Sequence, residues 1–410
     1  MRRPSPWLIL VIILLGILIV RDPRLRRTDD LLLSWFLQHS NATLPPAHVT
    51  VVEIGREDFQ DLAPSKLRQP LPPGESSRRS LSPLEYALFL QATLELQPAV
   101  IAIEPVLVWR EEDETQEQVF LDQAMRVPKL LVAVELGGKG EHDLSTEDVP
   151  ALPNVRGPRG HVPVFRGINR QPADDLRLIA TPGFLSPPNE KADITRAPMV
   201  YEYRGEIVPS FPLQALLLWL GVTPADVKVE LGSQIILPNG WKIPIRRDGT
   251  MTVNPGAWSS VRRLSLNDLL LAAHDRGEQG SSTHEAADLK NDIVILRLGS
   301  DPLQGPTAFA PAIATIQQNA YICRASTVVD WLLILAAALA GCFYRKFSRS
   351  DFFFGAALFL AAYGLVELGF LSMHRVWLPM LMPLVLLLFL LVVRVLDREG
   401  AVKHEIAATG

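Results

Sequence analysis

The 410-residue chain has little of what metal-binding, disulfide-linked and nucleic-acid-binding proteins usually show. It holds two cysteines, Cys323 and Cys342, which excludes a disulfide framework and a cysteine-based zinc site. The eight histidines show no ligand spacing, so we expect no metal site. The formal net charge of −4 leaves no positive excess to pair with phosphates, and nucleic acid is therefore not an expected partner.

Catalytic motifs are also absent from the sequence. It contains neither the G-x-x-x-x-G-K-[ST] phosphate loop nor the G-x-S-x-G nucleophile elbow. The densest acidic cluster, 111–114, fits a solvated helix N-terminus better than a cation site. We therefore expect a protein that is not an enzyme, with no catalytic residues and no cofactor.

Long apolar runs are what the chain does have. Residues 7–20 carry no charge and follow a short start, 1–6, that contains two arginines. A run of that length is short of the roughly 20 residues of a typical membrane span, and a cleaved signal peptide is the alternative. No small-residue cleavage site follows Val20, which favours an uncleaved transmembrane anchor.

Three further apolar runs lie near the other end of the sequence, and each approaches or reaches spanning length. Their short polar loops favour three transmembrane helices over buried helices of a soluble domain. Positive charges in loop 345–351 and in the tail 394–410 place both on the cytoplasmic side. The arginines within 21–27 argue locally for the opposite orientation of the first span. The predicted helices are 327–344, 352–372 and 376–393.

The region 21–326 alternates strand and helix patterns and is predicted to be an extracytoplasmic α/β domain. Residues 48–54, 99–108 and 129–136 read as buried strands. Capping boxes at Ser82 and Thr115 predict helices to Gln97 and Met125 between them. This order implies a mainly parallel sheet with crossover helices.

The second half of the domain is predicted in less detail. The Gly- and Pro-rich stretch 137–192 is expected to be loop or a small insertion. Asn239-Gly240 predicts a hairpin within 233–245, because both residues tolerate positive φ. The remaining predictions are strands at 199–205, 249–254 and 291–299, and helices at 209–222, 265–273 and 311–324.

The order of these pieces resembles the extracytoplasmic CHASE domain of type two, a bacterial sensory module found on cyclases and kinases. The resemblance covers about 24–325 and the three following spans. It rests on the segments RRTDDLLL (26–33), VTVVEIGREDF (49–59), AVIAIEPVL (99–107), VPSFPLQALLLWLG (208–221), IPIRRDGTMTVNPG (243–256), LKNDIVILRLGSDP (289–302) and IQQNA (316–320).

Several positions depart from the family pattern. Gly55 stands where an acidic residue is usual, and Glu104 where Asp is usual. Residues 316–320 lack the family's histidine, and no glycine follows Asp193. The resemblance implies a ligand site near Glu104, Asp193, Arg196 and Tyr201; a local structural role for Glu104 is the alternative reading.

Glu367 is the candidate residue within the membrane, because carboxylates inside spans are rare and usually functional. Its position near the end of its span also allows it to reach the interface or Tyr363. Small residues in the second and third spans (336, 337, 340 and 341; 355, 357 and 361) suit close helix packing and are compatible with a homodimer.

The predicted function is sensing at the cell inner membrane by a multi-pass protein whose large domain lies in the periplasm or outside the cell. Family members commonly continue into a catalytic domain, whereas 17 residues follow Val393 here. A separate kinase, cyclase or regulator is therefore the expected partner, and an unknown small molecule the expected ligand. A non-catalytic scaffolding protein of the cell envelope is the alternative; an enzyme or transporter fits less well.

Overall fold

The structure, a computed structural model, describes residues 6–22, 28–29, 31–33, 35–37, 43–54, 82–109, 114–138, 150–187, 195–279, 288–298, 307–343 and 348–394. The chain divides into two compact units. The α/β unit comprises residues 41–321, and the helical unit comprises residues 1–40 and 322–410.

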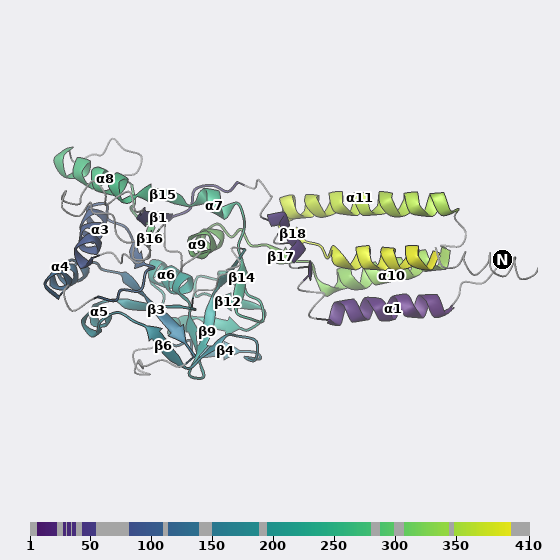
Figure 1. Cartoon of the computed structure of the whole chain (residues 1–410), viewed down its shortest axis with the longest axis horizontal. Coiled ribbons are helices and arrows are strands. Elements are labelled where there is room, and N and C mark those ends of the chain that lie inside the picture. Colours follow the sequence, from purple (N-terminus) through teal and green to yellow (C-terminus); the bar gives the residue numbers. More distant parts are fainter. Residues whose placement is uncertain are drawn as a thin grey trace, which may run out of the picture. The chain divides into compact units, whose positions relative to one another are not determined.

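A seven-stranded sheet forms the centre of the α/β unit (Figure 1). Both faces of this sheet are covered, as is usual for parallel sheets, and most of its strands are therefore short apolar runs in the sequence. The strands are β1 (Val49–Ile54), β2 (Val100–Ile103), β3 (Leu130–Gly137), β6 (Gly167–Arg170), β7 (Thr181–Leu185), β15 (Arg262–Ser265) and β16 (Ile293–Leu298).

The strand order is β15-β1-β16-β2-β3-β6, with β7 also paired to β3. Every pairing is parallel except that of β3 with β6. The prediction of a mixed α/β fold with a mainly parallel sheet is therefore confirmed. The position of β16 is not evident from the sequence pattern: this late strand lies between β1 and β2, the first two strands of the chain.

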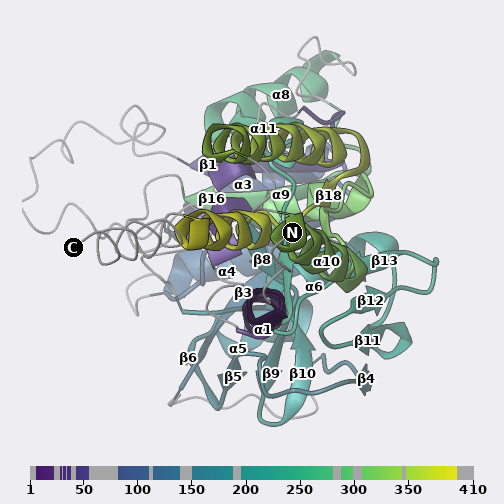
Figure 2. The same ribbon diagram turned by 90° about the vertical axis from the view of Figure 1, so that its right-hand side faces the viewer.

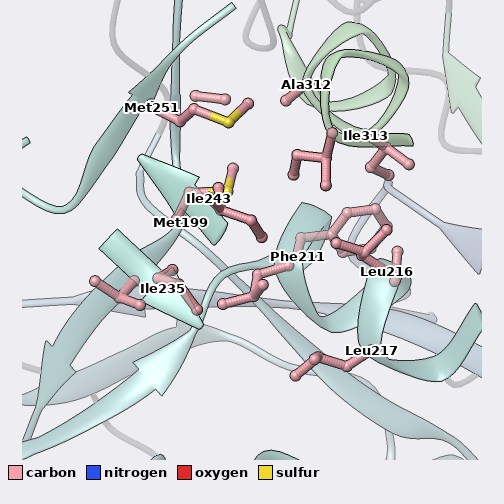
Figure 3. Packing of buried hydrophobic residues seen from close by; sticks show 14 of the residues in the cluster. Met199, Phe211, Leu216, Leu217, Ile235, Ile243, Met251, Ala312 and Ile313 are labelled. Carbon is pink, nitrogen blue, oxygen red and sulfur yellow. The ribbon is translucent and has the colours of Figure 1, made fainter. Parts of the chain in front are cut away.

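Helices cover both faces of this sheet. One face packs against the crossover helices α3 (Pro83–Glu95), α4 (Glu114–Ala124), α5 (Asp174–Ile179) and α8 (Leu266–Gln279). The other face packs against α6 (Phe211–Leu220), α7 (Ala257–Ser260) and α9 (Phe309–Gln317). Successive residues of β1, β2 and β16 alternate between the two cores, as strand geometry requires. Figure 3 shows Phe211 and Leu216 of α6 beside Ile313 of α9 in the second core.

Smaller sheets complete the α/β unit, and four neighbouring strands of one of them can be followed in Figure 2. That sheet contains β4 (Asn154–Arg156), β11 (Lys228–Glu230), β12 (Gln234–Ile236) and β13 (Lys242–Pro244), and Pro224–Asp226 forms a 3₁₀ turn before β11. The others pair β5 (Val164–Phe165), β9 (Val200–Tyr203) and β10 (Glu206–Pro209), and β8 (Arg196–Pro198) with β14 (Thr250–Thr252).

Local sequence signals explain several element boundaries. The Ser82 capping box is present: its backbone N–H donates to Glu85 Oε2 at 2.6 Å, and Ser82 Oγ accepts from the Glu85 N–H at 3.4 Å. The Asn239-Gly240 hairpin joins β12 to β13, and Gly240 has the positive φ of 85° that favours glycine.

Four local predictions are wrong. The last predicted span, 376–393, begins with the short strand Val376–Trp377, and its helix covers Leu381–Arg394. The stretch 137–192 contains β4 to β7 and α5 rather than loop alone, because its strands are too short to show periodicity. The helix expected to be capped at Thr115 begins at Glu114, so Thr115 lies inside its first turn. The helix predicted for 311–324 ends at Gln317, and Cys323–Arg324 form the short strand β17 instead.

The helical unit contains α1 (Pro6–Arg21), α10 (Thr327–Phe343), α11 (Arg349–His374) and a last helix, Leu381–Arg394. Helices α1, α10 and the last helix share an apolar core. Gly16 allows the close approach of α1 to α10, because a Cβ there would lie 2.6 Å from Ile334 Cγ1. Parallel strands β17 and β18 (Val376–Trp377) pair next to this bundle.

The small-residue faces predicted for close packing are used only in part: Gly341 is buried and Ala337 packs against the core of the bundle. Ala336 and Ala340 of α10 are exposed, as are Gly355, Ala357 and Ala361 of α11. The bundle also buries Ala338 of α10, on the side that meets α1 and the last helix.

Within the described residues, one helix is both long and apolar enough to cross a membrane by itself, over Ser350–Leu371 of α11. The other apolar helices are shorter: Ile9–Arg21, Val328–Cys342 and Leu381–Arg394 in the helical unit, and Phe211–Leu220 in the α/β unit. The last of these is the buried helix α6.

Candidate functional site

A row of alternating charges crosses the carboxyl end of the parallel sheet. We name it the charge row: Arg263 of β15, Glu53 of β1, Arg297 of β16 and Glu104, which directly follows β2. Arg263 pairs in register with Val51, two residues before Glu53. Glu53 pairs with Arg297, and the Glu104 N–H donates to Leu296 O at 3.1 Å. Strand order alone therefore makes these four residues neighbours.

All four side chains of the charge row point to the face that carries α9. Strand side chains alternate, and Val51, Ala102 and Ile295, each two residues before a member of the row, belong to the core on that face. Opposite charges face each other along the row, and Arg263 Nη1 lies 4.0 Å from Glu53 Oε1. The site thus offers both acceptor and donor groups at the end of the sheet where ligands of open α/β folds usually bind.

A cleft opens on this row, between the sheet, α7 and the start of α9. Its volume is about 20 Å³, enough for one water molecule or one small polar group. We call it the Glu104 cleft. Its walls include the charge row together with Trp258, Thr307, Ala310 and Pro311.

Glu104 is the most deeply buried charged residue of the cleft, with 2% of its surface exposed. Among the described residues, its Oε1 has no hydrogen-bond partner. Burial raises the pKa of Glu104 above the ordinary value of 4.5, while Arg297 and the Thr307 hydroxyl act in the opposite direction. A buried acceptor without a partner is unfavourable, so a hydrogen-bond donor entering the cleft would gain from meeting it.

The other residues expected to bind ligand are not brought to this cleft. Arg196 lies in β8, opposite Thr252 of β14. Tyr201 of β9 is 1% exposed and packs edge-on against Phe165, with ring centroids 5.6 Å apart. Burial raises the pKa of Tyr201 to about 12, an effect that Ser186 partly offsets. Neither residue lines the cleft, and Asp193 lies outside the described residues.

Glu367 belongs to a second cluster of charges, inside the helical unit. Its side chain is 1% exposed, and within the described part of the chain neither carboxylate oxygen has a hydrogen-bond partner. Asp29 is close enough to act on it electrostatically. Arg324 links Asp29 to Asp330, with N···O distances of 3.7 Å to each.

Asp29 also contacts the start of the last helix. Its Oδ1 accepts the backbone N–H groups of Met380 at 3.1 Å and Leu381 at 3.3 Å. Tyr363 on α11 donates its hydroxyl to Pro379 O at 3.0 Å. We name Asp29, Arg324 and Asp330 the ionic junction; it joins the chain segment before the α/β unit, β17, α10 and the last helix.

No group of three or more His, Cys, Asp or Glu side chains suited to a metal ion occurs in the part of the chain that the structure describes. Comparison with protein-family models, with curated proteins and with solved structures finds no match for this chain.

The sequence pattern pointed to Glu104 but missed Glu53, Arg263 and Arg297. A signal for two of them existed, since VTVVEI and IVILRL each carry one charge near the end of an apolar run. The ionic junction left no such signal, because Asp29 and Arg324 are distant in sequence and lie in short polar segments.

The pKa shift of Glu104 predicts how the stability of the protein depends on pH. A raised pKa means that the folded chain holds this proton more tightly than the unfolded chain. That contribution is full below pH 4.5, the ordinary pKa, and is lost as the pH rises through the folded-state value. Glu104→Gln does not titrate, so its stability relative to the natural protein is expected to increase with pH.

Thermal unfolding of both proteins between about pH 4 and 8 measures this difference in stability. This pH range covers the values at which a carboxyl group with a raised pKa titrates. Glu53→Gln is the matched control, because its side chain is 38% exposed in the same row. A stability difference for Glu104→Gln that stays constant or falls with pH would contradict the prediction.

Proposed function

We propose that the chain is a membrane-anchored sensor. In this proposal the α/β unit is an extracytoplasmic domain of the CHASE type-two kind, and a small molecule binds it by placing one polar group in the Glu104 cleft. Binding alters the helical unit, and a separate signalling protein in the membrane or cytoplasm responds to the change. The observation that carries the proposal is the charge row, with its buried and unsatisfied carboxylate oxygen facing a cleft at the carboxyl end of a parallel sheet.

Membrane anchoring is supported by the outer surfaces of the helices. Large apolar side chains are exposed on α1, α10 and α11 although each helix also packs inward, and soluble proteins rarely expose such extended apolar surfaces. Examples are Trp7 at 74%, Leu332 at 59%, Phe354 at 72% and Leu365 at 72% exposed.

We propose four spans, formed by α1, α10, α11 and the last helix. The 26 residues of α11 extend about 39 Å at 1.5 Å per residue, more than a hydrocarbon core of about 30 Å. The 17 residues of α10 are at the lower end of spanning length. The shorter helices would span the membrane only if charged residues at their ends extend to the interface. Long arginine side chains can do this, because their aliphatic part stays in the apolar region while the charged group reaches water.

The chain's connectivity supports signalling between the units. The α/β unit joins the helical unit covalently at both of its ends, near residues 41 and 321. A ligand acts as a signal only if it binds one of two states more tightly than the other. A conformational change in the α/β unit can therefore act on the helical unit through two covalent connections.

The test is purification of the tagged full-length protein from native membranes after mild crosslinking, with partners identified by mass spectrometry. A stoichiometric kinase, cyclase or other regulator is the expected result. Recovery of envelope-assembly proteins alone, or of the chain alone, would contradict the sensor proposal. It would favour the alternative, a non-catalytic scaffold of the cell envelope.

A further inference from the structure

Helix α9 reaches from the Glu104 cleft to the point where the chain leaves the α/β unit. Ala310 and Pro311 in its first turn line the cleft. Thr307, two residues before the helix, interacts with the Glu104 carboxylate. The helix has nine residues, a length of about 13 Å, and its last residue lies four positions before the end of the unit at Tyr321.

The C-terminal end of α9 holds the chain's entry into the same unit. The Gln317 side chain bonds the backbone of His48 twice: Oε1 accepts the His48 N–H at 2.9 Å, and Nε2 donates to the His48 carbonyl at 3.2 Å. The next side chain, Gln318, donates to the carbonyl of Pro45. We call this set of bonds the glutamine clip; it ties entry residues 45–48 to the exit.

A second contact holds residues 318–321, where the chain leaves the α/β unit. Buried Asn254 donates through Nδ2 to the carbonyl of Ala320 at 2.9 Å. The backbone N–H of Asn254 donates to Thr315 Oγ1 at 3.2 Å, and that hydroxyl donates to the carbonyl of Pro311, a cleft residue, at 2.7 Å. One hydrogen-bonded chain therefore runs along α9 from the cleft to the exit.

The middle of α9 is packed so that the helix moves as one body. Ala312, Ile313 and Ala314 are fully buried between the sheet and α6, where close packing resists bending. Helices at subunit interfaces shift by about 1–2 Å when proteins change state, and we take a shift of that size for α9. A displacement at the first turn of α9 is thus carried to its last turn.

We propose that α9 is the coupling helix of the sensor: occupation of the Glu104 cleft displaces its first turn, and the glutamine clip passes that displacement to both covalent connections of the α/β unit. This inference rests on the proposed function and adds its route of transmission. Gln317 and Asn254 are positioning residues in this scheme, since neither lines the cleft.

The test is hydrogen–deuterium exchange on the full-length protein in lipid nanodiscs. The ligand is unidentified, so the probe of the cleft is the substitution Glu104→Gln, which removes the charge facing Thr307 and Arg297. We expect exchange of the His48 amide, the one amide of 45–48 that bonds α9, and of the amides in 318–321 to change by about fivefold or more, because these bonds depend on the position of α9. Tyr201→Phe, a buried change away from the cleft, is the matched control and should leave both segments unchanged.

The glutamine clip is tested in the same experiment by Gln317→Leu, which removes both the acceptor for the His48 N–H and the donor to its carbonyl. In this background, Glu104→Gln should still alter exchange at 307–311 but no longer at His48. Unchanged exchange at His48 and 318–321 in the single Glu104→Gln variant would overturn the coupling role of α9. An equal response at His48 with and without Gln317→Leu would overturn the role of the clip.

These outcomes are separate from the proposed function, because thermal-shift screening of the same variants measures ligand binding directly. Binding that depends on Glu104, without an exchange response at His48, would leave the sensor proposal standing and remove α9 from its mechanism.

Discussion

Replacing Arg324 with leucine is expected to destabilise the helical unit by about 3 kcal/mol, the lower end of the effect of removing one partner from a buried ion pair. The side chains of Asp29 and Asp330 are only 6% and 5% exposed, and Arg324 lies 3.7 Å from both. Both carboxylates would lose their cation together. Since the Arg324 side chain is itself 36% exposed, solvent reduces the effect below its maximum.

The loss should extend to the last helix, because Asp29 also accepts the N–H groups of Met380 and Leu381. Unfolding of the full chain in detergent measures the effect, and Arg324→Lys is the matched control, which keeps the charge. The double variant Asp29→Asn with Arg324→Leu should lose clearly less than the sum of its single changes. Strictly additive losses would show that the ionic junction does not act as a unit.

Truncating Phe211 to alanine is expected to destabilise the α/β unit by about 3–5 kcal/mol, the range for large aromatic side chains removed from a core. Phe211 is fully buried at the start of α6, and its ring centroid lies 5.8 Å from that of Phe309. It also covers Gly183 of β7, where an added Cβ would lie 2.7 Å from the Phe211 ring. Figure 3 shows the surrounding side chains that would line the resulting cavity.

Chemical denaturation of the full chain gives this loss directly. Phe211→Leu should lose less, since it leaves a smaller cavity, and Leu178→Ala, at a side chain that is 85% exposed, should have little effect. A loss below about 1 kcal/mol for Phe211→Ala, typical of surface changes, would mean that this core is not packed as described.

Much of the α/β unit could be predicted because its signals are local. Ser82 and Glu85 lie three residues apart and form their capping box through neighbouring backbone groups. Asn239 and Gly240 set a tight turn on their own. Unbroken apolar strands indicate a sheet buried on both faces, which in turn favours parallel pairing.

The charge row could not be predicted, because it depends on strand order. Glu53 and Glu104 belong to consecutive strands of the chain, and only the insertion of β16 between them brings Arg297 into place. Arg263 joins the row through the pairing of β15 with β1. Pairing order is a long-range property that local periodicity does not contain, and the same is true of the bonds between Gln317 and His48.

The residues that the family resemblance implies for ligand binding lie in different environments. Glu104 lies in a cleft, whereas Tyr201 fills an aromatic core with Phe165, Phe184 and Tyr203. A tyrosine in a buried strand is most easily accommodated as a packing residue, and nothing in its local sequence separates that role from ligand contact.

The most direct test of the account is a thermal-shift screen of the full-length protein in detergent against a library of small polar metabolites, run in parallel on Glu104→Gln and Tyr201→Phe. We predict that at least one compound raises the unfolding temperature of the natural protein and of Tyr201→Phe, but not that of Glu104→Gln. Stabilisation that persists unchanged in Glu104→Gln, or an absence of any stabilising compound across a broad library, would contradict the claim that the Glu104 cleft is the ligand site of a sensor.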